Sequence, residues 1–420
     1  MSNQINRDNN HMKLKQLLII IALLPLQVIA FAGLTPEQST KFKEDLTYYL
    51  DTIKHNYAYF EQKETDWQQV SSFAWLHFNK VKNRTDFLTL IERLQIELYD
   101  NHMQLLNSFP FSPKVLPSSA DIYAEYKDGK ALVVNLMADS AAHKALEIGD
   151  EILKINDQPV FKALSRYVGN SFAEVNDDIY SWALNVVLAG DRGKERFLTI
   201  KRNQKTINIP LAETQFLSFS TPITSKRIDD FVYIRFNNSL GNNDILQLFP
   251  QVIEEAQDTN GLIIDLRTTP GGGNSLIARA ILGHFIEQDH FYQMHESPYD
   301  QKNFGVKRSW VEIASPLKPY YSKPVMVLVN QWTGSMGEGI ALGFDTMQNA
   351  TVIGTKMAQL LGSMQDYRMP NTNIGFKVST EKMFHVNGIP RENYRPKVLV
   401  TISTKNVDEV LEKALELLSQ

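Results

Sequence analysis

The stretches Gly261-Leu-Ile-Ile-Asp-Leu-Arg-Thr-Thr-Pro-Gly-Gly-Gly273 and Val327-Leu-Val-Asn-Gln-Trp-Thr-Gly-Ser-Met-Gly-Glu338 decide the fold of the C-terminal half of this chain. Each is an apolar run, typical of a buried strand, that ends in a turn. Three consecutive glycines leave backbone N–H groups with no Cβ beside them, so a negatively charged oxygen can approach closely. Ser335 follows the second strand at the start of a predicted helix, where a nucleophile is accessible. The two turns together predict acyl-transfer chemistry.

Strand and helix patterns alternate around these two turns. Strands are expected at residues 232–236, 262–266, 325–329, 351–353 and 397–402, and helices at 246–256, 276–285, 338–347 and 407–418. This alternation predicts an α/β domain at residues 225–420, with a sheet covered by helices.

The N-terminal half divides into two further blocks. Residues 33–110 have a helical pattern that begins at the cap-like pair Thr35-Pro36, so we expect a helical subdomain there. Prolines at 110, 113 and 117 mark a linker. Residues 115–215 follow the order strand, short helix, Gly-Asp turn and strand, which closely resembles a PDZ domain. Such domains bind extended peptide ends by adding a strand to a sheet edge, although a packing or lid role is the alternative.

Composition limits the classes of function. The chain has 420 residues, 43% of them hydrophobic and 21% charged, as expected for a globular protein of two to four domains. A net charge of −4 without a basic stripe argues against nucleic acid as a partner. The absence of cysteine excludes disulfides, thiolate zinc sites and a cysteine nucleophile.

Residues 1–32 have the pattern of a cleaved signal peptide. Basic residues precede an apolar stretch from Leu17 to Ala32, which ends in the small-residue sequence Ala30-Phe-Ala32. An uncleaved anchor is disfavoured because the stretch contains Pro25 and is shorter than a spanning helix requires. We therefore expect an exported protein, periplasmic or secreted, with no membrane span after cleavage.

The motifs are similar to those of a known family of serine peptidases, which includes the carboxy-terminal processing proteases and the tricorn core protease. Asp265-Leu-Arg-Thr-Thr-Pro-Gly-Gly272 resembles that family's Asp-Leu-Arg-Asn-Asn-Pro-Gly-Gly signature, and Ser335-Met-Gly-Glu338 its Ser-x-x-Glu. The order of a PDZ-like block before an α/β domain also agrees. The resemblance implies a multidomain α/β protein whose catalytic domain has the helix-covered sheet of the ClpP/crotonase type.

The general base distinguishes two branches of this family. The carboxy-terminal processing proteases use a lysine about twenty-five residues after the nucleophile, but Leu360 stands there, and Lys356 is the nearest lysine. The tricorn branch uses a histidine in a Leu-x-Asp-x-His pattern, which Leu98-Tyr-Asp-Asn-His102 fits. The resemblance therefore implies His102 as the base. An imidazole base predicts activity that falls as the pH drops through roughly 6 to 7.

The remaining site residues follow from the same resemblance. Glu392 is the expected orienting carboxylate, and Asn101 stands where the tricorn branch has a serine. Backbone N–H groups of Met336 and of Gly271 or Gly272 would form the oxyanion hole. Each residue also has a structural interpretation: Ser335 and Glu338 as a capping box, His102 as a buried structural histidine, and the glycines as a simple turn.

The expected function is an exported serine endopeptidase that cleaves extended peptides or protein tails without a cofactor or metal. A non-catalytic peptide- or ligand-binding protein on the same scaffold is the alternative. An esterase using His385 is a further alternative, but its nucleophile elbow requires glycine where Thr333 stands. Arg267 is expected to form a salt bridge. The histidines at 284, 290 and 295 match no metal-ligand spacing, and we interpret them as part of a solvated loop.

Overall fold

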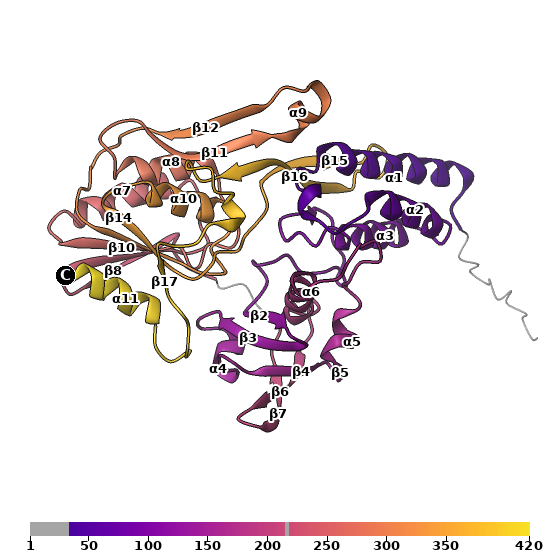
Figure 1. Ribbon diagram of the computed structural model, residues 1–420, viewed down its shortest axis with the longest axis horizontal. Coiled ribbons are helices and arrows are strands. Elements are labelled where there is room, and N and C mark those ends of the chain that lie inside the picture. The colour runs from indigo at the N-terminus through magenta and orange to yellow at the C-terminus, as the bar shows by residue number, and fades with distance from the viewer. Residues whose placement is uncertain (1–32, 215–217) are drawn as a thin grey trace, which may run out of the picture.

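The computed structural model describes residues 33–214 and 218–420 and has a mixed α/β, multidomain architecture (Figure 1). The predicted signal peptide, residues 1–32, lies outside the described residues. Within the described part of the chain, every helix is too short or too polar to cross a bilayer.

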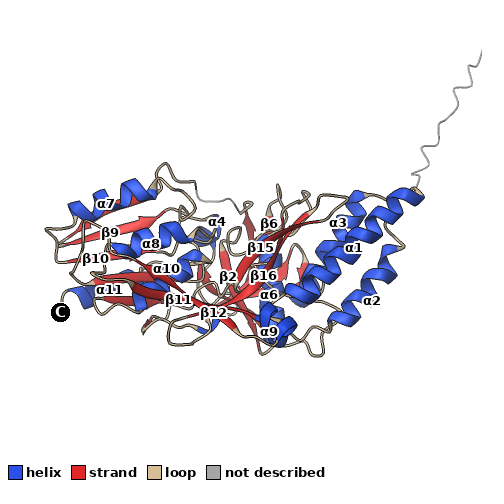
Figure 2. Ribbon diagram, turned by 90° about the horizontal axis from the view of Figure 1, so that it is seen from above, coloured by secondary structure: helices blue, strands red, loops and turns tan. Residues whose placement is uncertain are grey.

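The N-terminal block is helical, as the sequence predicts. It contains α1 (Pro36–Asn56), the short 3-10 helix η1 (Phe60–Gln62), α2 (Trp67–Phe78) and α3 (Arg84–Ile96). Thr35 caps α1 and accepts a hydrogen bond from the Gln38 N–H, so the predicted start of this helix is confirmed. The helices share their core with Phe376 and Val378 of β16 (Gly375–Phe384). Figure 2 shows these helices beside β16.

The middle block is a sheet with short helices against it. Its strands are β2 (Ile122–Lys127), β3 (Lys130–Leu136), β4 (Glu151–Ile155), β5 (Gln158–Pro159), β6 (Arg196–Arg202) and β7 (Lys205–Leu211), in the order β2-β3-β4-β6-β7 with β5 beside β4. Its helices are α4 (Ala141–Ala145), α5 (Val160–Leu164) and α6 (Asp177–Ala189). The apolar faces of the sheet and of α6 form a core of their own.

Helix α6 covers the β2 edge of this sheet. Among the described residues, β2 pairs with β3 alone, so its other edge presents the N–H and C=O groups of Ala124 and Tyr126. The Asn185 side chain bonds the Ala124 N–H at 3.0 Å and the Ala124 C=O at 2.7 Å. The Ser181 hydroxyl does the same for Tyr126, at 2.9 and 3.2 Å. An added peptide strand would need these same four backbone groups.

The C-terminal domain is built on a sheet in the order β17-β14-β13-β10-β9-β8. Its strands are β8 (Ile223–Ile228), β9 (Phe231–Phe236), β10 (Gly261–Asp265), β13 (Val325–Val329), β14 (Ala350–Gly354) and β17 (Val398–Leu399). Helices α7 (Ile245–Glu255), α8 (Ser275–Gly283) and α10 (Met336–Asp345) pack on one face, and α11 (Glu409–Leu418) packs on the other. The predicted strand at 397–402 is wrong in extent, because only two of its residues pair with β14.

Strands β9, β10, β13, β14 and β17 run parallel, so the turns that follow β10 and β13 lie at the same edge of the sheet. Thr269 and Thr333 form a parallel bridge between these turns. The Thr333 hydroxyl also donates to the Leu266 carbonyl at 3.0 Å. The glycine turn and the serine turn are thereby held side by side.

The C-terminal domain has a second sheet of its own, which the sequence does not predict and which joins the N-terminal block to this domain. It contains β1 (Gln104–Leu105), β11 (His290–Ser297), β12 (Arg308–Ala314), β15 (Ser363–Arg368) and β16 (Gly375–Phe384), with α9 (Pro298–Phe304) at its end and the 3-10 helix η2 (Arg391–Asn393) following β16. Figure 2 shows β11 and β12 reaching across from the α10 region toward α9.

The solvated-loop interpretation of the three histidines is therefore wrong. His290 and His295 belong to β11, where the His290 ring lies 2.6 Å from the Thr346 hydroxyl and the His295 ring lies 3.0 Å from a Glu381 carboxylate oxygen. His284 is buried at the end of α8 and bonds the Pro319 carbonyl at 2.8 Å. Within the described residues, no group of three or more side chains with suitable donors could hold a metal ion.

Candidate active site

Ser335 occupies the junction between β13 and α10. Its backbone has φ 54° and ψ −111°, a conformation that a residue with a side chain rarely adopts. The Ser335 N–H donates to Glu338 Oε2 at 2.9 Å, which ties the junction to the first turn of α10. This strained turn brings the serine to the wall of a cavity of about 860 Å³.

The glycine turn lies directly opposite Ser335. Gly272 has φ +70°, and a Cβ at this position would lie 3.4 Å from the Ser335 hydroxyl oxygen. The Gly271 N–H is already engaged, because it donates to Asn238 Oδ1 at 2.9 Å. Met336 is the first residue of α10, so its N–H has no acceptor within the helix. Gly272 and Met336 are thus better placed than Gly271 to offer N–H groups to an oxyanion.

His102 reaches the same cavity through β1. This strand pairs with β16, with Gln104 opposite Lys377, and so carries the end of the N-terminal block to the catalytic domain. The imidazole Nδ1 lies 2.8 Å from the Leu361 carbonyl oxygen, and the His102 backbone N–H donates to Asp100 Oδ1 at 2.8 Å. Because a carbonyl can only accept, Nδ1 carries the proton and the lone pair lies on Nε2.

The surroundings keep this imidazole neutral. The His102 side chain is 8% exposed. Burial, followed by the positive charge of Arg391, lowers the pKa of the imidazole to about 4, while the Leu361 carbonyl and the Asp100 carboxylate oppose the shift. This pKa lies below the range of roughly 6 to 7 in which the sequence predicts that activity falls. The reason is that the ring is buried and its Nδ1 contacts a backbone carbonyl rather than a carboxylate.

One cavity contains most of the predicted site residues. The side chains or backbone of His102, Gly271, Gly272, Ser335 and Met336 all line it. Leu360, where a lysine-dependent relative would have its base, also lines it. Sequence reasoning missed other lining residues: Asn238, Gln293, His295, Trp310, Lys377, Glu381 and Arg391. Most of these residues lie on β11, β12 and β16. Their position near Ser335 depends on how these strands pair, which the sequence motifs do not indicate.

The alternative bases lie elsewhere. Lys356 forms an ion pair with Glu125 and lines a separate cavity of about 530 Å³. The His385 ring is buried, with Nε2 3.4 Å from Asp345 Oδ2. Of the three residues weighed as a base, only His102 lines the Ser335 cavity.

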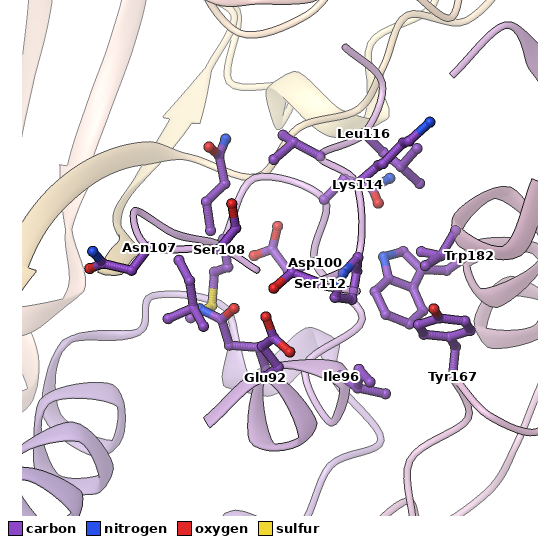
Figure 3. A pocket seen from close by; sticks show the side chains of 18 of the residues that line it. Glu92, Ile96, Asp100, Asn107, Ser108, Ser112, Lys114, Leu116, Tyr167 and Trp182 are labelled. Carbon is purple, nitrogen blue, oxygen red and sulfur yellow. The ribbon is translucent and has the colours of Figure 1, made fainter. Parts of the chain in front are cut away.

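Asn101 and Glu392 also line the cavity that contains Lys356. Glu392 Oε1 accepts a hydrogen bond from Gln62 Nε2 at 3.0 Å, and the Glu392 carbonyl accepts one from Gln359. Asn101 additionally borders a third, smaller cavity of about 140 Å³, where Figure 3 shows the Glu92 and Asp100 carboxylates beside Ser112. Leu116 lines all three cavities, so they meet at this side chain.

Glu338 and Arg391 lie behind the nucleophile, in the interior. Burial raises the pKa of the Glu338 carboxyl to about 7, although Arg391 and backbone N–H groups, including that of Ser335, oppose the shift. Arg391 Nε lies 3.9 Å from Glu338 Oε2. The predicted salt bridge of Arg267 is confirmed, since its guanidinium pairs with Asp265 at 2.7 Å and with Asp408 at 2.6 Å.

The chain is similar in sequence to known proteins. Residues 230–398 match Peptidase family S41. The chain is 22% identical over 358 residues to the tricorn protease of Thermoplasma volcanium, covering 80% of this chain and 32% of tricorn. It is 26% identical over 357 residues to the carboxy-terminal processing protease CtpA of Bacillus subtilis, covering 82% of this chain and 68% of CtpA. The chain thus spans about a third of tricorn and two thirds of CtpA.

The fold is also that of a solved protein. The crystal structure of mature CPAF superposes with a TM-score of 0.59 at 16% identity, covering 91% of this chain and 96% of that one. At this identity the likeness concerns the fold alone.

Proposed function

Because this chain belongs to the S41 family of serine-type peptidases, we propose that it hydrolyses extended peptides or protein tails with Ser335 as nucleophile and His102 as general base. The observation that carries the proposal is the single cavity shared by Ser335, His102 and Gly272. The hydrogen bond between His102 Nδ1 and Leu361 supports the role of the base, because it leaves Nε2 free to accept a proton.

The residues of the cavity support an ordinary acyl-transfer sequence. His102 Nε2 takes the proton of the Ser335 hydroxyl while its oxygen attacks the scissile carbonyl. The Gly272 and Met336 N–H groups stabilise the negative oxygen that forms. The imidazolium then gives its proton to the leaving amine. Water, activated by the same ring, releases the acyl group from Ser335.

A third group should orient the His102 imidazole. The family pattern predicts Glu392 in this role, assisted by the residue at position 101. The 2.8 Å contact of Nδ1 with Leu361 supports a backbone carbonyl in this role instead. Glu392→Gln separates the two: a loss of turnover as severe as that of His102→Ala favours the carboxylate, and a change of a few-fold favours the carbonyl.

Two further parts of the proposal rest on sequence. The apolar stretch within residues 1–32 supports export to the periplasm or the medium, which N-terminal sequencing of the mature protein tests directly. The resemblance of residues 115–215 to a PDZ domain supports a role in handling the substrate. Because α6 covers the edge of β2, we infer that this role does not use strand addition at Ala124 and Tyr126.

A fluorophosphonate probe tests the activity. The mature protein is expected to be labelled once, and Ser335→Ala to remain unlabelled and to lose turnover of peptides by roughly 10⁴. His102→Ala should lose turnover to a similar extent, and the double variant should be hardly worse, since members of one catalytic unit are not additive. A folded wild-type protein that is neither labelled nor active would instead indicate a binding protein on this scaffold.

A further inference from the structure

We propose that Arg391 is a positioning residue. It holds the turn that carries Ser335 in a fixed position relative to the loop 360–362, whose Leu361 carbonyl orients His102. The inference rests on the proposed roles of Ser335 and His102. It concerns a residue outside the motifs that identified the site, and it stands on two hydrogen bonds and one ion pair of a buried guanidinium.

On the side of the base, Arg391 holds the loop that orients His102. One terminal nitrogen, Nη2, donates to the Leu360 carbonyl at 2.7 Å and to the Gly362 carbonyl at 2.9 Å. The carbonyl of the residue between them, Leu361, accepts from His102. Arg391 therefore fixes the two peptide groups that flank the acceptor of the imidazole.

On the side of the nucleophile, Arg391 acts through Glu338. Its Nε lies 3.9 Å from Glu338 Oε2, the oxygen that accepts the Ser335 N–H at 2.9 Å. Glu338 is fully buried, and the positive charge of Arg391 opposes the rise in its pKa. Arg391 therefore favours the ionised form of this carboxyl, which is the stronger acceptor behind the strained backbone of Ser335.

The guanidinium thus has two separable properties. Its planar fork reaches two carbonyls and Glu338 at once, a geometry that an ammonium group cannot reproduce. Its charge acts on His102, whose imidazole also faces Lys377, which lowers its pKa, and Asp100, which raises it. Arg391 is 3% exposed, so little water screens this charge.

The experiment compares Arg391→Lys with Arg391→Met. Both variants are expected to lose kcat by roughly 10- to 100-fold with little change in KM, as for other losses of orientation at a reacting pair. In Arg391→Met the acid limb of kcat/KM should also move to higher pH, because removing a positive charge raises the pKa of both His102 and Glu338. Arg391→Lys keeps the charge and should keep the wild-type acid limb. Arg395→Met, four residues along the chain and exposed, is the matched control and should behave as wild type.

A role limited to stability predicts a different pattern. In that case both variants lose activity in proportion to their folded fraction, measured by circular dichroism, and the acid limb stays in place. That result, or wild-type kcat in both variants, overturns the inference. The His102 titration, followed by NMR in a Ser335→Ala background, gives the charge effect without turnover. An inactive wild type thus contradicts the proposed function, whereas an unmoved His102 titration in Arg391→Met contradicts this inference.

Discussion

The carbonyl oxygen of Leu361 lies 2.8 Å from Nδ1 of His102. A carbonyl fixes the tautomer of an imidazole as a carboxylate does, but it brings no negative charge to stabilise the imidazolium. The base is therefore correctly oriented and yet has a low affinity for protons. This combination distinguishes the site from one in which a buried carboxylate contacts the ring.

The pH dependence of turnover follows from this arrangement. Since burial and Arg391 lower the pKa of His102 to about 4, the ring stays unprotonated down to about that pH. The Glu338 carboxyl, whose pKa burial raises to about 7, protonates at a higher pH than His102 and accepts the Ser335 N–H, so a limb near pH 7 belongs to that group. We expect protonation of His102 to lower kcat/KM for a peptide substrate only as the pH approaches 4. The measurement needs circular dichroism at each pH, to confine it to the folded protein, and NMR of the His102 ring, to distinguish the two groups. A His102 titration between roughly pH 6 and 7 would show that the imidazole is solvated or paired with a carboxylate.

The backbone of Ser335 predicts an unusual stability effect. Its φ of 54° with ψ −111° costs a residue with a Cβ about 1–3 kcal/mol, and glycine adopts it more readily. Ser335→Gly is expected to be more stable than Ser335→Ala by about 1 kcal/mol, although both are inactive. Urea unfolding of the two variants measures the difference. Equal stability would contradict the strained conformation of the nucleophile turn.

Local sequence signals predicted the parts of this fold that depend on neighbouring residues. The Thr35 cap and the strands that end at Asp265 and Val329 are confirmed because their signals lie within the elements themselves. The link between β1 and β16 was missed because these strands pair across some 270 residues, whereas β11 with β12 and β15 with β16 pair locally and were simply not predicted as strands. The contact of Leu361 was beyond prediction for another reason: it uses a backbone carbonyl, which every residue type offers.

Gly272 separates crowding of the site from strain of the backbone. An alanine Cβ there would lie 3.4 Å from the Ser335 hydroxyl oxygen, in van der Waals contact, and would occupy space beside the proposed oxyanion donor, so Gly272→Ala should lower kcat by about 10²- to 10³-fold. Gly305 is the matched control, with φ +69° and open space around it. Gly305→Ala should lower stability by a similar amount, about 1–2 kcal/mol, and leave kcat unchanged. A parallel loss of kcat in both variants would assign the effect to instability.

Asn185 closes the edge of the middle sheet. Asn185→Ala leaves the N–H and C=O of Ala124 without their buried partner, so the free energy of unfolding should fall by about 2 kcal/mol. Amide exchange at Ala124 should accelerate, whereas the exposed Asn208→Ala should change neither quantity. Slow exchange at Ala124 that persists in Asn185→Ala would show that another group covers this edge. Peptide-dependent protection at Ala124 in the wild type would restore strand addition as the binding mode.

The choice between His102 and Lys356 as the base decides which branch of the family this chain follows in its chemistry. Lys356 is paired with Glu125 in the neighbouring cavity, where burial lowers its pKa less than Tyr123 and Glu125 raise it. A lysine with a raised pKa stays in the ammonium form near neutral pH and therefore has no lone pair with which to accept a proton. Lys356→Met should therefore change turnover of a peptide substrate by only a few-fold, whereas His102→Gln, which keeps a polar side chain of similar reach, should lose roughly 10³-fold or more. The fluorophosphonate reaction should show the same contrast, because it also requires an activated serine. If Lys356→Met abolishes labelling while His102→Gln retains it, the base lies in the cavity that contains Lys356, on the other side of Leu116. The mechanism proposed for the Ser335 cavity is then wrong.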